Sequence, residues 1–334
     1  MATLPLLPQS PSKLVGIARL AASGESIRQG HDVEYFTLPV RSLLNRCVSK
    51  RQLPFTWTIN PYRGCEFACK YCYARYTHEF MEMRDGVDFE QKIYVKQHAS
   101  DLLRQELRVV KAGESIAIGT ATDPYQPAER KFEVTRAILE EFALHEGLEL
   151  GIVTKSNMVT RDIDLLKRIS EHNRVSVSVT VTTLKVELAR ILEPRAPRPD
   201  LRMEAVRQLN EAGIRTGVNC CPVLPGITDS PRYLEAVVRA TAAAGGKHIF
   251  ANPLFLKPCS AAVFMPFLEK EFPHLAESYR ERYNGRAFLP KSYHERISQL
   301  MAKLRQKHGM IRQRERESSG MRQLHAGAEQ MNLF

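Results

Sequence analysis

The sequence predicts an α/β fold whose parallel strands form a barrel or a partial barrel, with peripheral extensions at both ends. From about residue 55, short apolar runs alternate with segments in which apolar residues recur every three or four positions. Several of these helical segments end in glycine, as helices commonly do. The alternation of strand and helix occurs six times, which favours a barrel over a small doubly wound sheet.

The expected elements follow one another through parallel, right-handed connections. The expected strands span residues 55–60, 115–120, 148–155, 174–181, 215–223 and 247–254. The expected helices between them span residues 99–113, 133–147, 161–172, 201–213 and 230–246. Because parallel barrels carry their active sites at the carboxyl ends of the strands, the segments that follow these strands are the first candidates for function.

The segments outside the barrel have weaker patterns. We expect an N-terminal extension (1–50), the barrel (51–258), a C-terminal helical region (259–310) and a flexible tail (311–334). The N-terminal extension contains one helical candidate, VRSLLNRC (40–47), and the C-terminal region contains two helices, near 264–272 and 292–309. The tail is charged and short of large apolar residues until its end, which is typical of disorder.

The composition is that of a soluble globular protein, with 334 residues, 43% hydrophobic and 25% charged. No run approaches the roughly 20 apolar residues that span a membrane. The N-terminus is broken by prolines and lacks the pattern of a signal peptide. We therefore expect a cytoplasmic protein with no membrane partner and with its seven cysteines reduced. The net charge of +11 is compatible with nucleic-acid binding, although many cytosolic proteins are basic without it.

One of the expected strands has a polar face. Ser176, Ser178, Thr180 and Thr182 alternate along residues 174–182 and therefore point to the same side. On the inside of a barrel, such a face would line a functional site. The alternative interpretation is an exposed face made of residues that favour β structure.

Three cysteines lie in the stretch RGCEFACKYCYAR (63–75), which follows the first expected strand. Cys65, Cys69 and Cys72 have the spacing C-x3-C-x2-C, and the nearest other cysteines are Cys47 and Cys220. Three thiolates and a histidine such as His78 can hold zinc. Alternatively, three thiolates can hold a [4Fe–4S] cluster with one iron left open for chemistry. The residues alone leave both interpretations open.

The cysteine spacing, with Tyr71 just before the third cysteine, resembles the signature of the radical S-adenosylmethionine superfamily. The resemblance covers residues 55 to 258 and implies a partial (β/α)6 barrel. It implies that Cys65, Cys69 and Cys72 bind a [4Fe–4S] cluster whose fourth iron takes S-adenosylmethionine. Reduction by a donor such as flavodoxin or ferredoxin then yields methionine and a 5′-deoxyadenosyl radical, which abstracts hydrogen from the substrate.

Several short motifs resemble those of the spore photoproduct lyase-related group, often labelled DNA repair photolyases. They are NPYRGCEFACKYCYA, GTATDPYQPAE, TKS, RDIDLL, LEPRAP and PVLPGITD. The resemblance implies a lyase-like enzyme with DNA as a partner. It also implies that Tyr71 packs near the adenine and that Tyr71 and Tyr73 return the radical to the cofactor. Packing within the loop is the alternative for Tyr71.

The sequence departs from this group at the hydrogen donor. The lyase uses a cysteine near its second strand, but no cysteine lies between Cys72 and Cys220 here. Cys220 and Cys221 are adjacent on a strand and point to opposite faces, so at most one of them lines the barrel. The alternative for each is a small buried apolar residue. The departure weighs against cleavage of thymine dimers.

The resemblance implies that Thr120, Asp123, Lys155 and Ser178 bind S-adenosylmethionine. Thr120 and Asp123 match the family's contacts to the methionine amino group, and Lys155 and Ser178 match contacts to its carboxylate or ribose. For Lys155, the alternative is an ion pair with Asp162 or Asp164. For a nucleic-acid substrate, phosphate contacts are expected from Arg130, Arg195 and Arg202, although solvated arginine is the commoner state.

Three functions follow from these patterns. The first is a radical enzyme acting on DNA or another nucleic acid, and the second is a radical enzyme acting on a small molecule or a peptide. The third is a zinc-stabilised binding module without catalysis. The last five residues, QMNLF, resemble peptides that dock on the bacterial sliding clamp, with Gln330, Leu333 and Phe334 as the contacting residues. A short structural segment is the alternative for these residues.

Overall fold

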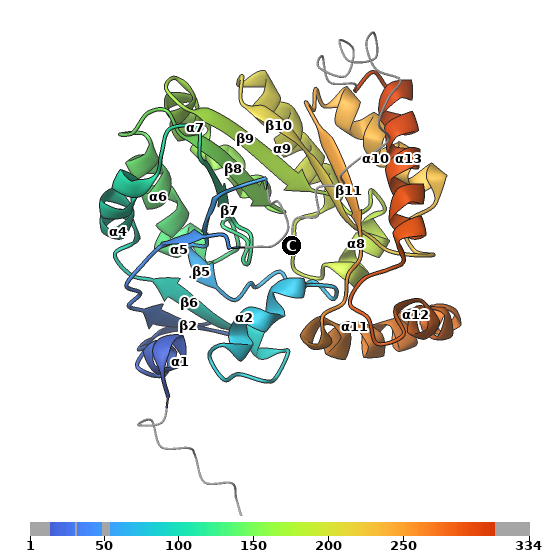
Figure 1. The fold of residues 1–334 in the computed structure, drawn as a ribbon, viewed down its shortest axis with the longest axis horizontal. Helices are drawn as coiled ribbons and strands as arrows, with labels where there is room; N and C mark the ends of the chain where they lie inside the picture. The colour runs from blue at the N-terminus through green and yellow to red at the C-terminus, as the bar shows by residue number, and fades with distance from the viewer. Residues whose placement is uncertain (1–13, 31, 49–53, 311–334) are drawn as a thin grey trace, which may run out of the picture.

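The computed structural model describes residues 14–30, 32–48 and 54–310, and its main sheet has seven strands in the order β11-β10-β9-β8-β7-β4-β3. Six of these strands are parallel neighbours in the order of the chain. They are β4 (Trp57–Ile59), β7 (Ser115–Ile118), β8 (Glu149–Thr154), β9 (Arg174–Thr180), β10 (Arg215–Val223) and β11 (Ile249–Pro253). The sheet forms the predicted partial (β/α)6 barrel, and all six expected strands are confirmed (Figure 1).

Helices follow the strands and cover the outer face of the barrel (Figure 1). The predicted helices are α4 (Ala99–Glu106), α6 (Val134–Phe142), α7 (Ile163–Ser170), α9 (Pro199–Glu211) and α10 (Pro231–Ala243). The packing follows from strand alternation. In β9, Val175, Val177 and Val179 are buried, because they lie on the face opposite the polar residues of the same strand.

A second sheet of four strands, in the order β1-β2-β6-β5, was not predicted from the sequence. It consists of β1 (Ser26–Gly30), β2 (Val33–Leu38), β5 (Tyr62–Arg63) and β6 (Lys92–Lys96). Strand β6 pairs in parallel with β2 and antiparallel with β5. Helix α1 (Gly16–Ala22) lies against this sheet and contributes Ala21 to a small apolar cluster with Leu38, Met81 and Tyr94 (Figure 1). The N-terminal residues are therefore joined to the cysteine region by a shared sheet.

The helix predicted for VRSLLNRC is wrong, because residues Leu44–Arg46 form strand β3. This strand pairs antiparallel with β4, with Leu44 opposite Ile59. Leu43 and Leu44 are buried, and their backbone N–H groups donate to Glu106 Oε2 at 3.0 and 2.8 Å. The local pattern of this segment also suits a helix. Its pairing with β4 and its hydrogen bonds to Glu106 therefore determine that it forms a strand.

The remaining helices are short or lie towards the C-terminus. They are α2 (Tyr76–Glu79), α3 (Asp88–Gln91), α5 (Glu129–Phe132), α8 (Val186–Leu192), α11 (Pro258–Glu271), α12 (Ala276–Tyr283) and α13 (Lys291–Lys307). Helices α11 and α13 confirm the two helices expected after the barrel. Among the described residues, no helix is long and apolar enough to cross a membrane. The clamp-like residues Gln330, Leu333 and Phe334 lie outside the described residues.

Candidate active site

The cysteine loop runs from Gly64 to Cys72, between strand β5 of the second sheet and helix α2. Gly64 has φ +82°, and a Cβ at this position would lie 2.7 Å from Lys92 O and 2.9 Å from Phe89 O. A side chain would therefore collide with the backbone that supports the loop. Glycine permits both the positive φ and the close approach of the loop to β6.

Three separate elements hold the loop in place. Cys65 N donates to Phe89 O in α3 at 2.9 Å, and Lys70 N donates to Leu192 O at the end of α8, also at 2.9 Å. Thr122 Oγ1, in the segment after β7, donates to Gly64 O at 2.6 Å. These bonds set the position of the cysteines relative to the carboxyl ends of the barrel strands.

The three cysteines are free thiols in a shared environment. Burial, followed by the neighbouring Asp123 carboxylate and the other two thiols, raises the pKa of Cys65 well above its usual value. Burial raises the pKa of Cys69 to about 12, although the nearby Lys155 ammonium opposes this shift. Burial is thus the main cause of both shifts, and the neighbouring thiols and charged groups add to it or oppose it. A donor set of three thiols, with no fourth cysteine in the loop, fits a cluster with one open iron.

The zinc interpretation requires a fourth ligand, and His78 does not supply it. His78 Nε2 hydrogen-bonds with Lys92 O at 3.1 Å, and its ring packs edge-on against Phe89 with centroids 5.2 Å apart. Burial lowers the pKa of His78 to about 4. No three His, Cys, Asp or Glu side chains within the described residues are arranged to hold a single metal ion. Cluster ligands stand further apart than the ligands of one ion, because each cysteine binds a different iron.

Tyr71 is buried, and its hydroxyl is engaged by polar residues of the barrel. The hydroxyl lies 3.1 Å from Thr182 Oγ1 and donates a short hydrogen bond to Glu193 Oε1. Lys155 Nζ lies 5.7 Å from the centre of the Tyr71 ring, which is within range of a cation–π interaction. Tyr71 therefore links the cysteine loop to Glu193 and Lys155.

Glu193 and Arg202 form a buried ion pair behind Tyr71. Arg202 Nη1 lies 2.5 Å from Glu193 Oε2, and both side chains are 1% exposed. Burial alone would raise the pKa of Glu193, but the Arg202 and Lys155 charges hold it below its usual value. The expected phosphate contact of Arg202 is therefore wrong, because its buried guanidinium is paired with Glu193. Arg130 and Arg195 are exposed.

Asp123 connects the segment after β7 to the end of β8. Its Oδ1 accepts from Thr154 Oγ1 at 2.6 Å and from Tyr125 N at 2.9 Å. Its Oδ2 accepts from Lys155 N at 2.6 Å. The same segment begins at Gly119, where φ is +90° and a Cβ would lie 2.5 Å from Val153 O, so that a side chain is excluded. Asp123 thus lies next to Lys155 at the carboxyl ends of two neighbouring strands.

Lys155 does not form the alternative ion pair with Asp162 or Asp164. Asp162 and Asp164 pair with Arg136 instead, at 2.6 and 3.5 Å. Burial would lower the pKa of Lys155, but Cys69, Glu193 and Asp123 together raise it above its usual value. Lys155 is therefore a protonated cation surrounded by thiols and carboxylates.

Thr120 and Tyr73 meet on the other side of the loop. Tyr73 OH donates a short hydrogen bond to Thr120 O, and its ring lies 5.3 Å from that of Phe255. Asn60 Nδ2 lies 3.3 Å from Thr120 Oγ1, and Asn60 Oδ1 accepts from Ala121 N at 2.7 Å. Asn60 is a site residue that the sequence reasoning missed, although it opens the quoted motif NPYRGCEFACKYCYA.

The polar face of β9 points into the barrel, as predicted. Thr180 and Thr182 are 5% and 2% exposed, which excludes a surface face. Ser178 Oγ lies 2.9 Å from His248 Nε2, and Ser178 is paired with Val153, two residues before Lys155. Ser178 thus lies on the inner face, but its hydroxyl is directed to His248.

Cys220 and Cys221 separate as predicted. Cys220 is 1% exposed and belongs to the apolar core. Cys221 is half-buried, with its Sγ 4.0 Å from Phe250 O and its carbonyl 3.5 Å from Thr182 Oγ1. Only Cys221 leaves the core towards the polar face.

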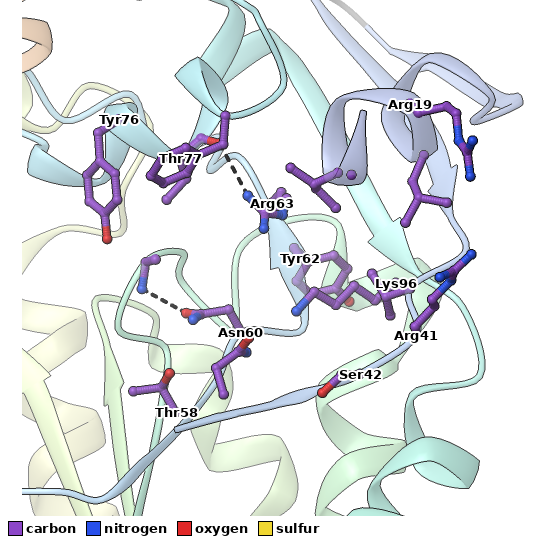
Figure 2. Close-up of a pocket in the computed structure, with 17 residues that line it drawn as sticks. Arg19, Arg41, Ser42, Thr58, Asn60, Tyr62, Arg63, Tyr76, Thr77 and Lys96 are labelled. Atoms are coloured by element: carbon purple, nitrogen blue, oxygen red, sulfur yellow. Dashed lines mark hydrogen bonds between the residues drawn. The ribbon is translucent and has the colours of Figure 1, made fainter. Parts of the chain in front are cut away.

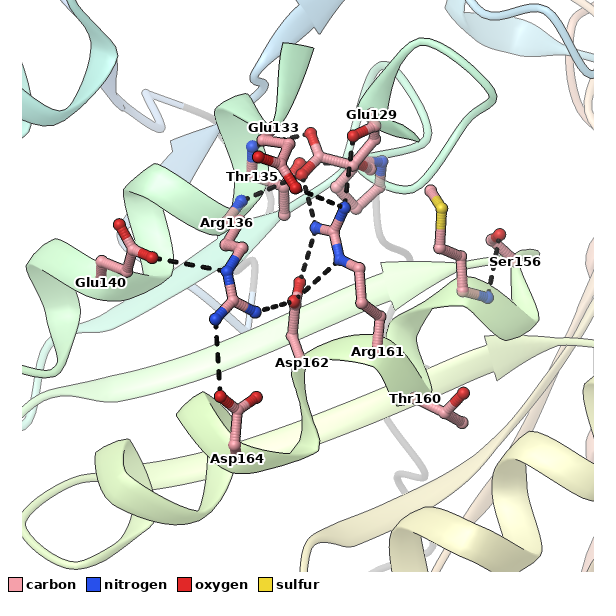
Figure 3. A network of polar contacts seen from close by, with 12 residues as sticks. Glu129, Glu133, Thr135, Arg136, Glu140, Ser156, Thr160, Arg161, Asp162 and Asp164 are labelled. Carbon is pink, nitrogen blue, oxygen red and sulfur yellow. Dashed lines mark hydrogen bonds and ion pairs between the residues drawn. The ribbon is translucent and has the colours of Figure 1, made fainter. Parts of the chain in front are cut away.

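Arg161, Asp162 and Asp164 of the motif RDIDLL belong to a network of ion pairs with Glu129 and Arg136 (Figure 3). Arg161 contacts Asp162 at 2.9 Å and Glu129 at 2.8 Å. Glu129 and Asp162 are both 0% exposed, and Glu129 Oε2 accepts from Tyr62 OH at 2.5 Å. The network therefore connects helices α5 and α7 to strand β5, directly before the cysteine loop, and its role is structural.

Comparison with known proteins supports this arrangement. The family model of the radical SAM superfamily matches residues 59–236. Uncharacterized protein Rv2578c of Mycobacterium tuberculosis is 35% identical over 306 residues, which cover 90% of this chain and 89% of the relative. Uncharacterized protein MJ0683 of Methanocaldococcus jannaschii is 31% identical over 232 residues, covering 70% of this chain and 81% of the relative.

Solved structures of spore photoproduct lyase share the fold. The lyase complexed with dinucleoside spore photoproduct has a TM-score of 0.60 and 15% identity, covering 90% of this chain and 86% of that chain. A mutant of the lyase with bound AdoMet and dinucleoside spore photoproduct has a TM-score of 0.61 and 16% identity, with the same coverage. The matched family region contains all three cysteines, Asp123 and Lys155, and the chain belongs to the radical SAM superfamily.

Proposed function

We propose that the chain is a radical enzyme in which Cys65, Cys69 and Cys72 hold a [4Fe–4S] cluster. The observation that carries this assignment is the group of three thiols beside Lys155, at the carboxyl ends of the barrel strands. When bound, the cluster supplies the electron that cleaves S-adenosylmethionine to methionine and a 5′-deoxyadenosyl radical. The sulfur donors come from one loop that glycine and three anchoring bonds hold against the barrel.

The residues around the thiols suit the charged groups of S-adenosylmethionine. Lys155 is a half-buried cation whose ammonium can pair with the methionine carboxylate, while Asp123 offers carboxylate oxygens to the methionine amino group. Thr120 and Ser178 are proposed to add hydroxyl groups, which Asn60 and His248 contact in the structure. Glu193 keeps Lys155 protonated and orients Tyr71 through its hydroxyl.

Tyr71 and Tyr73 are proposed to carry hydrogen atoms during turnover. Both flank Cys72, and their hydroxyls are held by Glu193 and by Thr120 O. A phenolic O–H that is fixed by a hydrogen bond keeps one orientation, which suits repeated transfer to and from a nearby carbon radical. Phenylalanine at either position preserves the ring and removes the O–H, so it separates this role from packing.

The proposed substrate is a nucleic acid, and the proposed reaction is lyase-like. Its support is the net charge of +11 and a fold shared over most of the chain with a lyase solved with a dinucleoside photoproduct. Hydrogen abstraction from a sugar or base carbon requires the substrate to reach the barrel next to the cysteine loop. A radical enzyme acting on a small molecule or a peptide is the competing outcome.

The test is anaerobic reconstitution with iron and sulfide, followed by measurement of 5′-deoxyadenosine under reducing conditions. We expect broad visible absorption, and deoxyadenosine formation that increases when single-stranded or ultraviolet-irradiated DNA is added. Lys155→Met should retain iron but weaken S-adenosylmethionine binding by at least about tenfold, because one buried charge pair is lost. Deoxyadenosine formation that DNA and RNA leave unchanged would reject the nucleic-acid substrate while leaving the cluster chemistry intact.

A further inference from the structure

A cavity lies between the N-terminal residues and the first strand of the barrel (Figure 2). Its volume is about 500 Å³, and it is bounded by helix α1, the segment 40–42, strands β4 and β5, helix α2 and the end of β6. The N-terminal residues therefore help to form a cavity with residues of the radical SAM region. None of the residues assigned above to the cluster or to S-adenosylmethionine lines it.

The lining of this cavity is strongly cationic. Arg19, Arg41, Arg63 and Lys96 line it, and no aspartate or glutamate does so within the part of the chain that the structure describes. Figure 2 shows Lys96 next to Tyr62 and Arg41, with Arg63 and Arg19 around the same space. The four cations come from α1, the segment 40–42, β5 and β6. They are therefore brought together by the tertiary fold and do not lie along the surface of one helix.

Lys96 is the most informative of these residues, because it is buried and its charge is not compensated by the described residues. It is the last residue of β6 and is only 7% exposed. Across residues 14–30, 32–48 and 54–310, no hydrogen bond or ion pair reaches its Nζ. Burial, aided by the charge of Arg63, lowers the pKa of Lys96 to about 7. The carboxylate that opposes this shift, Glu106, is already used by the backbone of β3 and the residue before it.

Burial disfavours the ammonium form of Lys96, and an anion bound in the cavity that Lys96 lines would restore it. Arg63 lines the same cavity, its Nη1 donates to Thr77 O at 3.2 Å, and burial lowers its pKa. A buried lysine and a half-buried arginine that face one cavity, with two exposed arginines at its side, form a site for an anion with several oxygen acceptors. Arginine and lysine together are the usual ligands of phosphate.

We propose that this cavity binds a phosphate group, with Lys96 and Arg63 as its inner ligands and Arg19 and Arg41 as its outer ones. The carrier of the phosphate is a phosphodiester of a nucleic acid if the proposed function holds, and a phosphorylated small molecule otherwise. The anion chemistry is the same in both cases. The inference rests on the proposed function only for the identity of the carrier.

The cavity shares a wall with the candidate active site. Asn60 and Ala121 line the cavity, and Asn60 also contacts Thr120, whose carbonyl accepts from Tyr73. A phosphate held at Lys96 would thus lie in a cavity that shares Asn60 with the candidate active site.

The experiment measures anion binding to the reconstituted protein by calorimetry, with sulfate as a probe because its charge is constant across neutral pH. The variants are Lys96→Met, Lys96→Arg and, as a control, Lys167→Met, which removes an exposed lysine on α7. We expect Lys96→Met to weaken sulfate binding by at least about tenfold, Lys96→Arg to retain most of it, and Lys167→Met to match the wild type. Wild-type affinity in Lys96→Met would overturn the proposal.

Three further compounds identify the carrier. A thymidine dinucleotide joined by one phosphodiester is compared with free thymidine, and inorganic phosphate is measured alongside. If Lys96→Met weakens the dinucleotide as much as sulfate, the site binds a nucleic-acid phosphate. If it weakens sulfate and inorganic phosphate only, the site still binds phosphate but the carrier is a small molecule. Melting temperatures of each variant without anion show whether the fold is intact.

Discussion

The buried pair between Glu193 and Arg202 yields a quantitative prediction for Glu193→Gln. Glutamine keeps the shape of the side chain and can still accept hydrogen bonds from Tyr71 and Thr182, but it removes the charge that faces Arg202. Arg202 would then keep only two backbone partners among the described residues, Pro197 O at 2.7 Å and Thr180 O at 3.1 Å. Its guanidinium would remain buried without a counter-charge.

The magnitude follows from the geometry. The N–O distance of 2.5 Å places the two charge centres about 4 Å apart, where unit charges attract by about 4 kcal/mol at an effective dielectric constant of about 20. Breaking a buried pair by removing one partner costs about 3–5 kcal/mol. At about 2–4 °C per kcal/mol, the apparent melting temperature should fall by roughly 6–20 °C.

The assay is thermal unfolding followed by circular dichroism at neutral pH, with Glu204→Gln as the control. Glu204 pairs with Arg207 on the exposed surface of α9, where its loss should leave the melting temperature unchanged within error. The double variant Glu193→Gln with Arg202→Met should recover most of the lost stability, because the buried guanidinium that lost its counter-charge is removed as well. A melting temperature within about 1 °C of the wild type for Glu193→Gln would refute the buried pair.

Three other predictions concern the cluster, the cavity and the tail. Cys69→Ala should lose both iron-dependent visible absorption and deoxyadenosine formation, whereas Cys259→Ala on α11 should keep both; retained iron in the first variant would remove Cys69 from the ligand set. Stability without added anion should rise between about pH 7 and about pH 10, because the unfolded chain binds a proton at Lys96 that the folded chain has released. Urea unfolding should show this slope in the wild type and lose it in Lys96→Met, and equal slopes would contradict the assignment. A peptide of residues 325–334 should bind a purified sliding clamp at about micromolar strength, and alanine at Leu333 and Phe334 should abolish that binding without affecting deoxyadenosine formation.

The sequence predicted the elements whose patterns are long and local. Strand β8 alternates buried and half-buried residues over its whole length, and α7 buries Leu165, Leu166 and Ile169 at helical spacing. From such a repeat of apolar residues, the buried face of an element can be predicted from its own sequence alone. The cysteines were also predictable, because a metal-binding loop concentrates its ligands in a few residues.

The second sheet and the buried charges were not predictable in this way. Strands β2 and β6 pair across more than fifty residues of sequence, as Glu34 opposite Lys92 shows, and neither strand has a strong pattern of its own. Glu193 and Arg202 meet because α8 and α9 bring them together, and their spacing is not that of neighbours on one helix. Lys155 is near Asp162 in the sequence, but Arg136 from α6 takes that carboxylate.

The placement of β6 in the middle of the second sheet determines how the chain can be divided. One edge of β6 pairs with residues Glu34 to Leu38 of β2. In β2, Tyr35 OH also donates to Glu66 Oε2 in the cysteine loop at 2.8 Å. A fragment starting at residue 51 would expose that edge, together with the buried Ile93 and Val95, and would be prone to aggregate. The region that matches the radical SAM family begins at residue 59 and therefore marks a limit of homology rather than an independent folding unit. In native-state hydrogen exchange, the amides of β2 and those of β6 should open together, as parts of one cooperative unit that includes the cysteine loop.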